Sequence, residues 1–251
     1  ILLGLMTVTA ADAAGRYTGK AKTKGGSQNP TDSAWSCATS DQAVRTIRLC
    51  TPKINDPKTS DRRRIRYLMK RAKAWIVEEE LWAAVNDYGR VNEIDPKNEV
   101  AMFEQGKVYT ELGEHSLAAE SYTRLLKTNP KNVDALCKRG GARLKLGQHE
   151  AAFKDYRTGL KIAANDVHCL VGLGNVHESL GDHKKAFEKY SAAIASDKRF
   201  WPAYYRRAEL YEKRGQRKMA IADYSRILQL NAVNVYARHQ LQNLGVREPY
   251  P

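Results

Sequence analysis

The 251-residue sequence has no internal run of about 20 consecutive apolar residues, the length that a transmembrane helix requires. It also has no glycine-rich phosphate-binding loop and no nucleophile elbow of the form GxSxG. Its four cysteines and six histidines never form the CxxC or HxxxH spacings that are typical of metal sites. We therefore predict no catalytic residues, no bound metal and no cofactor.

Acidic residues are few relative to basic ones. Lysine and arginine number 42 against 28 aspartates and glutamates, which gives a formal net charge of +14. A positive surface favours anionic partners, although net charge alone does not identify them. The apolar residues, 42% of the chain, are sufficient for a sizeable core.

A fixed period runs through the sequence. Gly106, Gly140 and Gly174 are equally spaced, and a second set of glycines recurs at one fixed distance after them in each block. A fixed period of this length is typical of stacked supersecondary units. Numbered from the start of each block, an alanine returns at place twenty and a tyrosine at place twenty-four: Ala118, Ala152 and Ala186, then Tyr122, Tyr156 and Tyr190.

This pattern resembles that of the tetratricopeptide repeat (TPR) family, whose unit is a helix-turn-helix of about 34 residues. The same frame extends in both directions, so that Ala84 and Tyr88 begin the series and Ala220 and Tyr224 end it. The resemblance implies an all-α fold, a right-handed α-solenoid of antiparallel helix hairpins. It covers five repeats, residues 65–98, 99–132, 133–166, 167–200 and 201–234, followed by a capping helix over 235–245 and a tail over 246–251.

The recurring residue types have a physical explanation. The glycine at place eight allows two helices to approach closely, and we expect it to face the alanine at place twenty. The glycine at place fifteen falls just after the first helix, where the left-handed conformation of a C-cap costs little without a Cβ atom. Asp95-Pro96 and Asn129-Pro130 are expected to end second helices, because proline cannot continue a helix.

The first 13 residues are apolar and end in small residues, ILLGLMTVTAADA. This composition is typical of the end of a signal peptide, and we interpret it as a remnant of one, with cleavage after Ala10 or Ala13. The alternative is an apolar tail without a targeting role. Residues 14–33 are rich in Gly, Lys, Ser and Thr and lack helical periodicity, which predicts a flexible basic linker. We therefore expect a periplasmic or secreted protein.

Two cysteines flank the segment that precedes the repeats. Cys37 and Cys50 lie on either side of an amphipathic stretch within residues 34–64, which we interpret as a degenerate half-repeat that caps the stack. In an exported chain this arrangement suggests a disulfide, and a cysteine pair before the repeats also resembles exported bacterial TPR proteins. Such a bridge would contribute roughly 3 kcal/mol. Two buried thiols are the alternative.

The remaining cysteines and the histidines do not indicate a ligand site. His115, His149 and His183 share place seventeen, and they cannot converge on one ion because packed helices lie about 10 Å apart. We expect them to open second helices as half-buried rings. Cys137 and Cys169 fall on the first helices of consecutive repeats. We predict buried thiols there, with a second disulfide as the alternative and a metal site as the least favoured interpretation.

The resemblance also implies a binding surface. In this family the second, fifth, ninth, twelfth and thirteenth places of each repeat line a concave groove, which binds an extended peptide or another protein. In this sequence that groove is apolar and basic toward its N-terminal end and more acidic toward its C-terminal end. The resemblance thus implies a non-catalytic protein-interaction scaffold. The predicted contact residues are Arg66, Met69, Lys73, Val100, Phe103, Lys107, Cys137, Lys145, His168, Asn175, Tyr205 and Glu209.

Two basic segments provide an alternative function. Residues 62–73 and 199–218 are rich in Arg and Lys, and a protein that binds anionic polymers or membrane surfaces would use such segments. A solvated helix face is the commoner explanation of a charge run. We do not expect specific nucleic-acid binding, because Tyr204 and Tyr211, which would have to stack on bases, occupy packing places.

Overall fold

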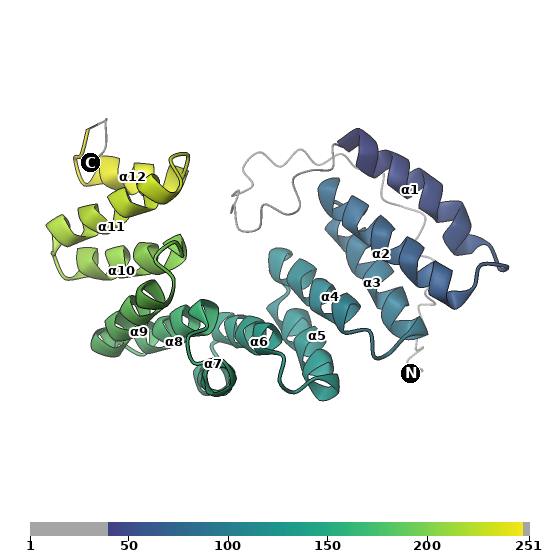
Figure 1. The fold of residues 1–251 in the computed structure, drawn as a ribbon, viewed down its shortest axis with the longest axis horizontal. Coiled ribbons are helices and arrows are strands. Elements are labelled where there is room, and N and C mark those ends of the chain that lie inside the picture. Colours follow the sequence, from purple (N-terminus) through teal and green to yellow (C-terminus); the bar gives the residue numbers. More distant parts are fainter. Residues whose placement is uncertain (1–39, 248–251) are drawn as a thin grey trace, which may run out of the picture. The chain divides into compact units, whose positions relative to one another are not determined.

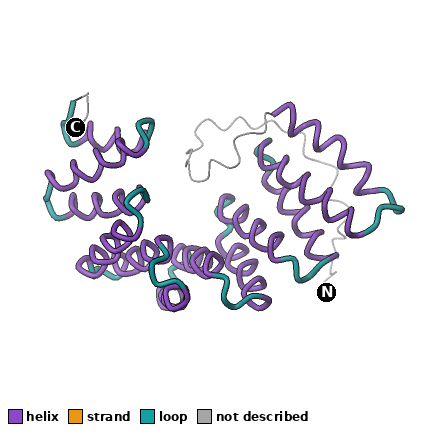
Figure 2. The backbone as a smooth tube through the Cα atoms, in the orientation of Figure 1, coloured by secondary structure: helices purple, strands orange, loops and turns teal. Residues whose placement is uncertain are grey.

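The computed structural model describes residues 40–247, which belong to one compact unit, residues 38–251. The predicted signal-peptide remnant, the basic linker and Cys37 lie outside the described residues. The described chain consists of helices joined by short loops (Figure 1, Figure 2). The predicted all-α repeat fold is confirmed.

Twelve helices follow one another in the described part of the chain. None of these helices is both long enough and apolar enough to cross a lipid bilayer. Their bounds are α1 Ser40–Asn55, α2 Asp61–Val77, α3 Leu81–Ile94, α4 Glu99–Glu111, α5 His115–Thr128, α6 Val133–Lys145, α7 His149–Ile162, α8 Val167–Ser179, α9 His183–Ser196, α10 Trp201–Lys213, α11 Arg217–Leu230 and α12 Val235–Asn243.

The five repeats are helix hairpins. We call α2, α4, α6, α8 and α10 the first helices, and α3, α5, α7, α9 and α11 the second helices. Each first helix packs against the second helix of its own repeat, and each second helix packs against the helix that follows it. Consecutive first helices from α4 to α10 also contact one another, whereas consecutive second helices in the described chain make no comparable contact. The first helices therefore lie on the inner side of the stack.

The tyrosine at place twenty-four fills the centre of each hairpin. Tyr88, Tyr122, Tyr190 and Tyr224 are completely buried, and Tyr156 is 3% exposed. Burying an aromatic side chain of this size contributes a large part of the apolar stabilisation of a repeat. The in-register tyrosines thus explain why the repeat period is maintained.

The glycine at place eight makes room for this tyrosine. A Cβ atom on Gly106 would lie 2.7 Å from the ring of Tyr122, and one on Gly174 would lie 2.4 Å from the ring of Tyr190. We expected the alanine at place twenty to face this glycine, but the nearest atoms belong to the tyrosine ring. A large ring and a residue without a Cβ atom are therefore complementary across each of these hairpins.

The prolines mark the ends of two second helices. Helix α3 ends at Ile94, two residues before Pro96, and α5 ends at Thr128, two residues before Pro130. The first helix that follows each joint is capped by an asparagine side chain, as in α4, where Asn98 accepts a hydrogen bond of 3.0 Å from a backbone N–H. Proline and cap together give a sharp boundary between these repeats.

One first helix ends on an unfavourable residue. Glu79 has a φ of 60°, in the left-handed region, at the place where later repeats have Gly113, Gly147, Gly181 and Gly215. A Cβ atom in this conformation costs roughly 1–2 kcal/mol, part of which is offset because glycine loses more backbone entropy on folding. We therefore expect Glu79→Gly to raise the free energy of unfolding by about 1 kcal/mol, measured as a higher urea midpoint.

The reverse change at Gly147 is the matched control. No atom lies within 4 Å of a Cβ atom built at Gly147, so only its backbone conformation, with a φ of 73°, opposes a side chain. Gly147→Glu should therefore lower the urea midpoint by an amount equivalent to about 1 kcal/mol. A midpoint that falls in Glu79→Gly would show that the conformation at Glu79 is not the destabilising factor.

Candidate functional site

The residues predicted to bind a partner lie on the first-helix face, as we call the surface formed by places two, five, nine, twelve and thirteen of the first helices. Cys137 is the exception, because it is only 6% exposed. The other eleven are accessible. Arg66, Lys73, Val100, Lys145 and His168 are exposed, and Met69, Phe103, Lys107, Asn175, Tyr205 and Glu209 are half-buried.

The N-terminal half of the first-helix face combines apolar and basic side chains. The ring of Phe103 packs edge-on against the buried ring of Tyr122, with centroids 5.7 Å apart, so its orientation is restricted. Val100 precedes it on the same helix and is 57% exposed. Lys107 lies one turn after Phe103 and pairs with Glu104 at 3.2 Å. This half therefore offers accessible apolar groups beside cations.

The C-terminal half contains a carboxylate that buried groups hold in place. The hydroxyl of Tyr190 donates to Glu178 Oε2 at 2.7 Å and lies 2.8 Å from Asn175 Oδ1, and Lys213 forms an ion pair with Glu178. Burial, the largest single influence, raises the pKa of Glu178, but the hydrogen bonds from Lys213 and Tyr190 and nearby cationic charge outweigh it and leave this pKa below its ordinary value. Glu178 is therefore ionised at neutral pH.

Helix α10 repeats this arrangement. The hydroxyl of Tyr224 donates to Glu212, and Arg206 pairs with Glu209 at 3.0 Å. Tyr205 packs edge-on against Tyr224, with ring centroids 5.9 Å apart. An accessible aromatic group thus lies beside carboxylates in this half, whereas the N-terminal half has aromatic and aliphatic groups beside cations.

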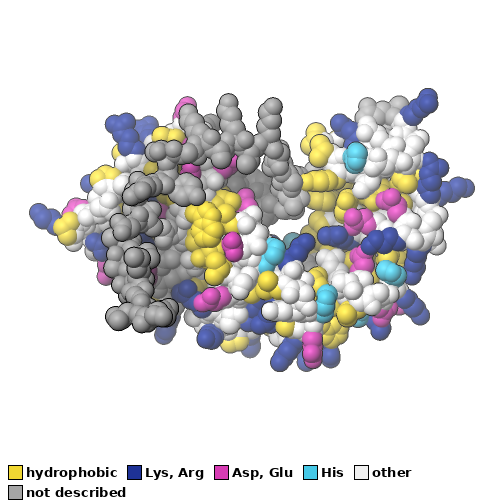
Figure 3. Space-filling view, turned by 180° about the vertical axis from the view of Figure 1, so that it is seen from behind, with side chains coloured by type: hydrophobic (Ala, Val, Ile, Leu, Met, Phe, Trp, Pro, Cys, Tyr) yellow, Lys and Arg dark blue, Asp and Glu magenta, His cyan; other side chains and the backbone are white. Residues whose placement is uncertain are grey.

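Figure 3 shows one face of the molecule with the N-terminal repeats on the left. Hydrophobic side chains form a patch on that side, and acidic side chains lie among Lys and Arg on the C-terminal side. Hydrophobic side chains also occur on the C-terminal side of this view and acidic side chains on the N-terminal side, so both kinds are spread over this face.

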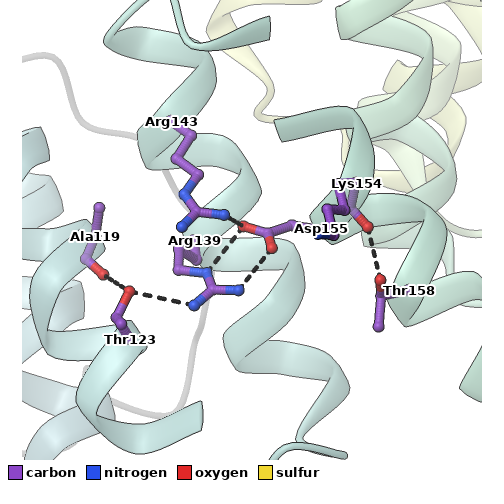
Figure 4. Close-up of polar contacts among 7 residues, drawn as sticks. All are labelled: Ala119, Thr123, Arg139, Arg143, Lys154, Asp155 and Thr158. Carbon is purple, nitrogen blue, oxygen red and sulfur yellow. Dashed lines mark hydrogen bonds and ion pairs between the residues drawn. The ribbon is translucent and has the colours of Figure 1, made fainter. Parts of the chain in front are cut away.

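A buried ion pair was not anticipated from the sequence. Arg139 in α6 donates from Nε and an Nη to the two oxygens of Asp155 in α7, at 2.9 and 2.7 Å, and Arg143 adds a third bond of 2.8 Å (Figure 4). The Asp155 side chain is only 3% exposed. Arg139 also donates to Thr123 Oγ1 in α5 at 3.2 Å. One guanidinium group therefore connects three helices of two repeats.

The same device recurs in alternate repeats. Arg71 pairs with Asp87 and Arg207 with Asp223, both through two hydrogen bonds, and both arginines also donate to a hydroxyl on the preceding repeat or cap. The two members of each pair are 16 residues apart and occupy places seven and twenty-three. The regular spacing of Arg and Asp was the sequence signal that could have revealed it. These pairs position the first helices and do not belong to the accessible face.

Comparisons with known proteins identify the repeats. A family model described as "TPR repeat" matches residues 106–147. A second model, described as "Tetratricopeptide repeat", matches residues 133–166 and 202–234. The chain is a TPR protein. No curated protein sequence matches this TPR protein.

Solved structures share the fold. A thermophilic TPR protein from Thermus thermophilus aligns with a TM-score of 0.64 and 18% identity over 72% of this chain and 98% of its own. A tetratricopeptide repeat protein from Parabacteroides merdae gives 0.63 and 21% over 81% of each chain. YrrB, described as a TPR protein with an unusual peptide-binding site, gives 0.50 and 19% over 77% of this chain and 97% of its own. Identities this low show the fold alone.

Cys137 and Cys169 form a disulfide in this TPR protein, with Cα atoms 5.1 Å apart. The prediction of two buried thiols is wrong, as is the placement of Cys137 on the accessible face. The bond fits because residue 159 is glycine. A Cβ atom built on Gly159 would lie 2.4 Å from Cys169 Sγ and would collide with it. Val91, Leu125, Ala193 and Ile227 occupy the equivalent place in other repeats. Glycine in place of a larger core residue at position 159 was therefore the sequence signal for the disulfide.

Cys50 is buried and has no disulfide partner among residues 40–247, and burial raises the pKa of its thiol. Its predicted disulfide partner, Cys37, lies outside the described residues, so the N-terminal bridge stays a prediction.

Other polar clusters do not extend the candidate site. Cys137, Asp166 and Cys169 form the one group with metal-ligand spacing among residues 40–247, but the two sulfur atoms are bonded to each other. His115, His149 and His183 begin α5, α7 and α9, the first two half-buried and the third exposed.

A pocket of about 410 Å³ lies near the junction of α1, α2 and α3. Arg64, on its wall, donates to the carbonyls of Ile54 and Asp56 and thereby closes the end of α1. None of the lining residues belongs to the first-helix face. The lining consists of Ile54, Asn55, Arg64, Arg90, Glu93 and Ile94.

Proposed function

We propose that this TPR protein is a non-catalytic interaction scaffold of the cell envelope that binds an extended segment of another protein on its first-helix face. The observation that carries the proposal is the row of accessible anchors on the first helices, with Val100 and Phe103 on α4 and Tyr205 on α10. Aromatic anchors surrounded by charged groups are typical of peptide-binding surfaces. The structurally similar YrrB has a peptide-binding site, which supports the same use of the fold.

The envelope location rests on the apolar first 13 residues, which lie outside the described residues. Fractionation of cells that produce the natural protein tests it. Recovery in the cytoplasmic fraction alone would contradict it, without bearing on the first-helix face.

The basic segments provide less support for a binder of anionic polymers or membrane surfaces. Arg64 is engaged with Asp61 and with backbone carbonyls, and Arg207 is engaged with Asp223. Arg62 and Arg63 are exposed, so this function predicts binding that weakens steeply with salt. Phosphatidylglycerol vesicles or heparin are suitable probes, and salt-insensitive binding would argue against it.

Capture of partners from envelope extract tests the proposed function. We expect Phe103→Ala and Tyr205→Ala each to reduce recovery of a specific partner about tenfold, because truncating an anchor of an interface costs about 1–2 kcal/mol or more. Ile162→Ala is the control, since Ile162 is 45% exposed but lies at the end of the second helix α7. Urea midpoints should establish that all variants are folded. Unchanged recovery of every partner by both variants would contradict the proposal.

A further inference from the structure

The hydroxyl of the tyrosine at place twenty-four has a different environment along the stack. In repeats four and five the hydroxyls of Tyr190 and Tyr224 donate to Glu178 and Glu212, which are side chains of the first-helix face. In repeats one and two the hydroxyls of Tyr88 and Tyr122 are sealed from solvent.

Repeat three differs from both groups. Tyr156 is 97% buried, but its hydroxyl has no hydrogen-bond partner among the described residues, and it is not one of the solvent-inaccessible oxygens. A polar group of this kind is satisfied either by water or by a ligand.

Gly141 explains the open hydroxyl. A Cβ atom on Gly141 would lie 3.5 Å from the hydroxyl oxygen of Tyr156, so this oxygen lies where the side chain of place nine would start. Leu144, at place twelve, offers no acceptor. The other four repeats have a longer polar side chain at place nine: Lys73, Lys107, Asn175 and Glu209. At place nine, the middle of the first-helix face thus offers backbone with one hydroxyl beside it.

The position of this hydroxyl is fixed by packing. The Tyr156 ring lies between two glycines, since Cβ atoms on Gly140 and Gly172 would lie 2.9 and 2.1 Å from it. Burial, and then the charge of Asp155, raise the pKa of Tyr156, so the hydroxyl is protonated at neutral pH and available as a donor. A rigid donor without a competing partner suits recognition of a carbonyl group.

We propose that Gly141 and the Tyr156 hydroxyl form a subsite for the main chain of an extended peptide, with a peptide carbonyl accepting a hydrogen bond from the hydroxyl. This inference rests on the proposed function and specifies its ligand. A residue without a side chain allows the peptide backbone to approach closely. The subsite recognises no particular side chain, so specificity comes from the two flanking halves of the face.

The side chains of the two halves of the first-helix face determine which peptide residues each half favours. Glu212, which has no ion-pair partner among the described residues, favours lysine or arginine at the end of the peptide that lies over repeats four and five. Phe103 favours an apolar residue at the other end. First helices are spaced about 10 Å apart, so three steps span about 30 Å, or roughly ten residues of extended chain. The ligand is therefore an extended peptide of about this length with one basic end and one apolar end.

A displayed library of random linear peptides, selected on the wild-type protein, supplies the probe. A peptide length of about 12 residues is sufficient to cover the span of extended chain between the two ends of the face. We expect selected peptides to have Lys or Arg at one end and apolar residues at the other.

Affinities measured by fluorescence polarisation test the subsite. Tyr156→Phe should bind the selected peptides about threefold to tenfold more weakly, the loss of one hydrogen bond. Tyr122→Phe should bind them unchanged because its hydroxyl is sealed. Gly141→Leu should weaken binding at least about tenfold by covering the hydroxyl.

Three outcomes decide between the two proposals. Equal affinities for Tyr156→Phe, Gly141→Leu and wild type, with peptides that still depend on Phe103, would overturn the subsite and leave the proposed function standing. Failure to select any peptide that depends on Phe103 would overturn both. Glu212→Gln tests the predicted charge preference, because this variant should lose affinity only for peptides with a basic end. Equal affinity of Glu212→Gln and wild type for a basic-ended peptide would overturn the predicted polarity.

Discussion

Asp155→Ala is expected to lower the free energy of unfolding by about 3–5 kcal/mol. The Asp155 carboxylate is 3% exposed and accepts hydrogen bonds from Arg139 and Arg143, whose side chains are only 15% and 23% exposed. Removing it leaves two cations poorly solvated and without their common partner. The measurement is the urea midpoint followed by circular dichroism, at a fixed ionic strength.

Asp61→Ala is the control for a surface ion pair. The side chain of Asp61 is 72% exposed and pairs with Arg64 at 3.0 Å. Since exposed pairs contribute at most about 1 kcal/mol, Asp61→Ala should change the midpoint little. Equal losses in the two variants would show that the Arg139–Asp155 connection between repeats does not stabilise the stack beyond a surface contact.

The fold could be predicted from the sequence because its main packing constraint repeats. A buried tyrosine requires space, and Gly106 and Gly174 provide it in the same register. The tyrosine recurs in all five repeats and the glycine in three of them, so one chain contains several samples of the same constraint. The accessible face follows from the same register, so that only Cys137 of the twelve predicted contact residues is buried.

The ion pairs could not be predicted by the same reasoning. A charged residue such as Arg139 or Asp155 is normally solvated, and a run of charges indicates an exposed helix face. Such a charged side chain is buried only when an oppositely charged side chain lies at the same level on the neighbouring helix. The constant spacing between Arg and Asp in alternate repeats contains this information, which lies in the pair and in neither residue alone.

The disulfide was the alternative and not the favoured prediction for a related reason. Equivalent places in stacked repeats lie about one helix spacing apart, which suggests that side chains of neighbouring first helices stay separate. Cys137 and Cys169 occupy different places, five and three, and their Cα atoms approach to 5.1 Å. The open hydroxyl of Tyr156 was equally invisible, because it results from the absence of a side chain at Gly141.

Reduction of the Cys137–Cys169 disulfide is expected to lower the free energy of unfolding by about 4 kcal/mol. The two cysteines are 32 residues apart, and closing a loop of that length in the unfolded chain accounts for this amount in the chain-entropy model. The bond joins α6 to α8, one turn before Gly141, so we also expect reduction to weaken peptide binding at the Tyr156 hydroxyl. Urea unfolding with and without a phosphine reductant measures the first effect.

Variants separate this bond from the predicted N-terminal bridge. In Cys50→Ala, reduction should still lower the free energy of unfolding by most of the wild-type amount. In the double variant Cys137→Ala, Cys169→Ala, reductant should change it much less. Thiol titration of the unreduced protein in denaturant gives an independent count, because burial no longer matters there. Two titratable thiols would indicate one bridge, which the variants identify, and none would indicate that Cys37 and Cys50 are bonded as well as Cys137 and Cys169. Four thiols would contradict both bridges. In that case the reductant should not change the free energy of unfolding.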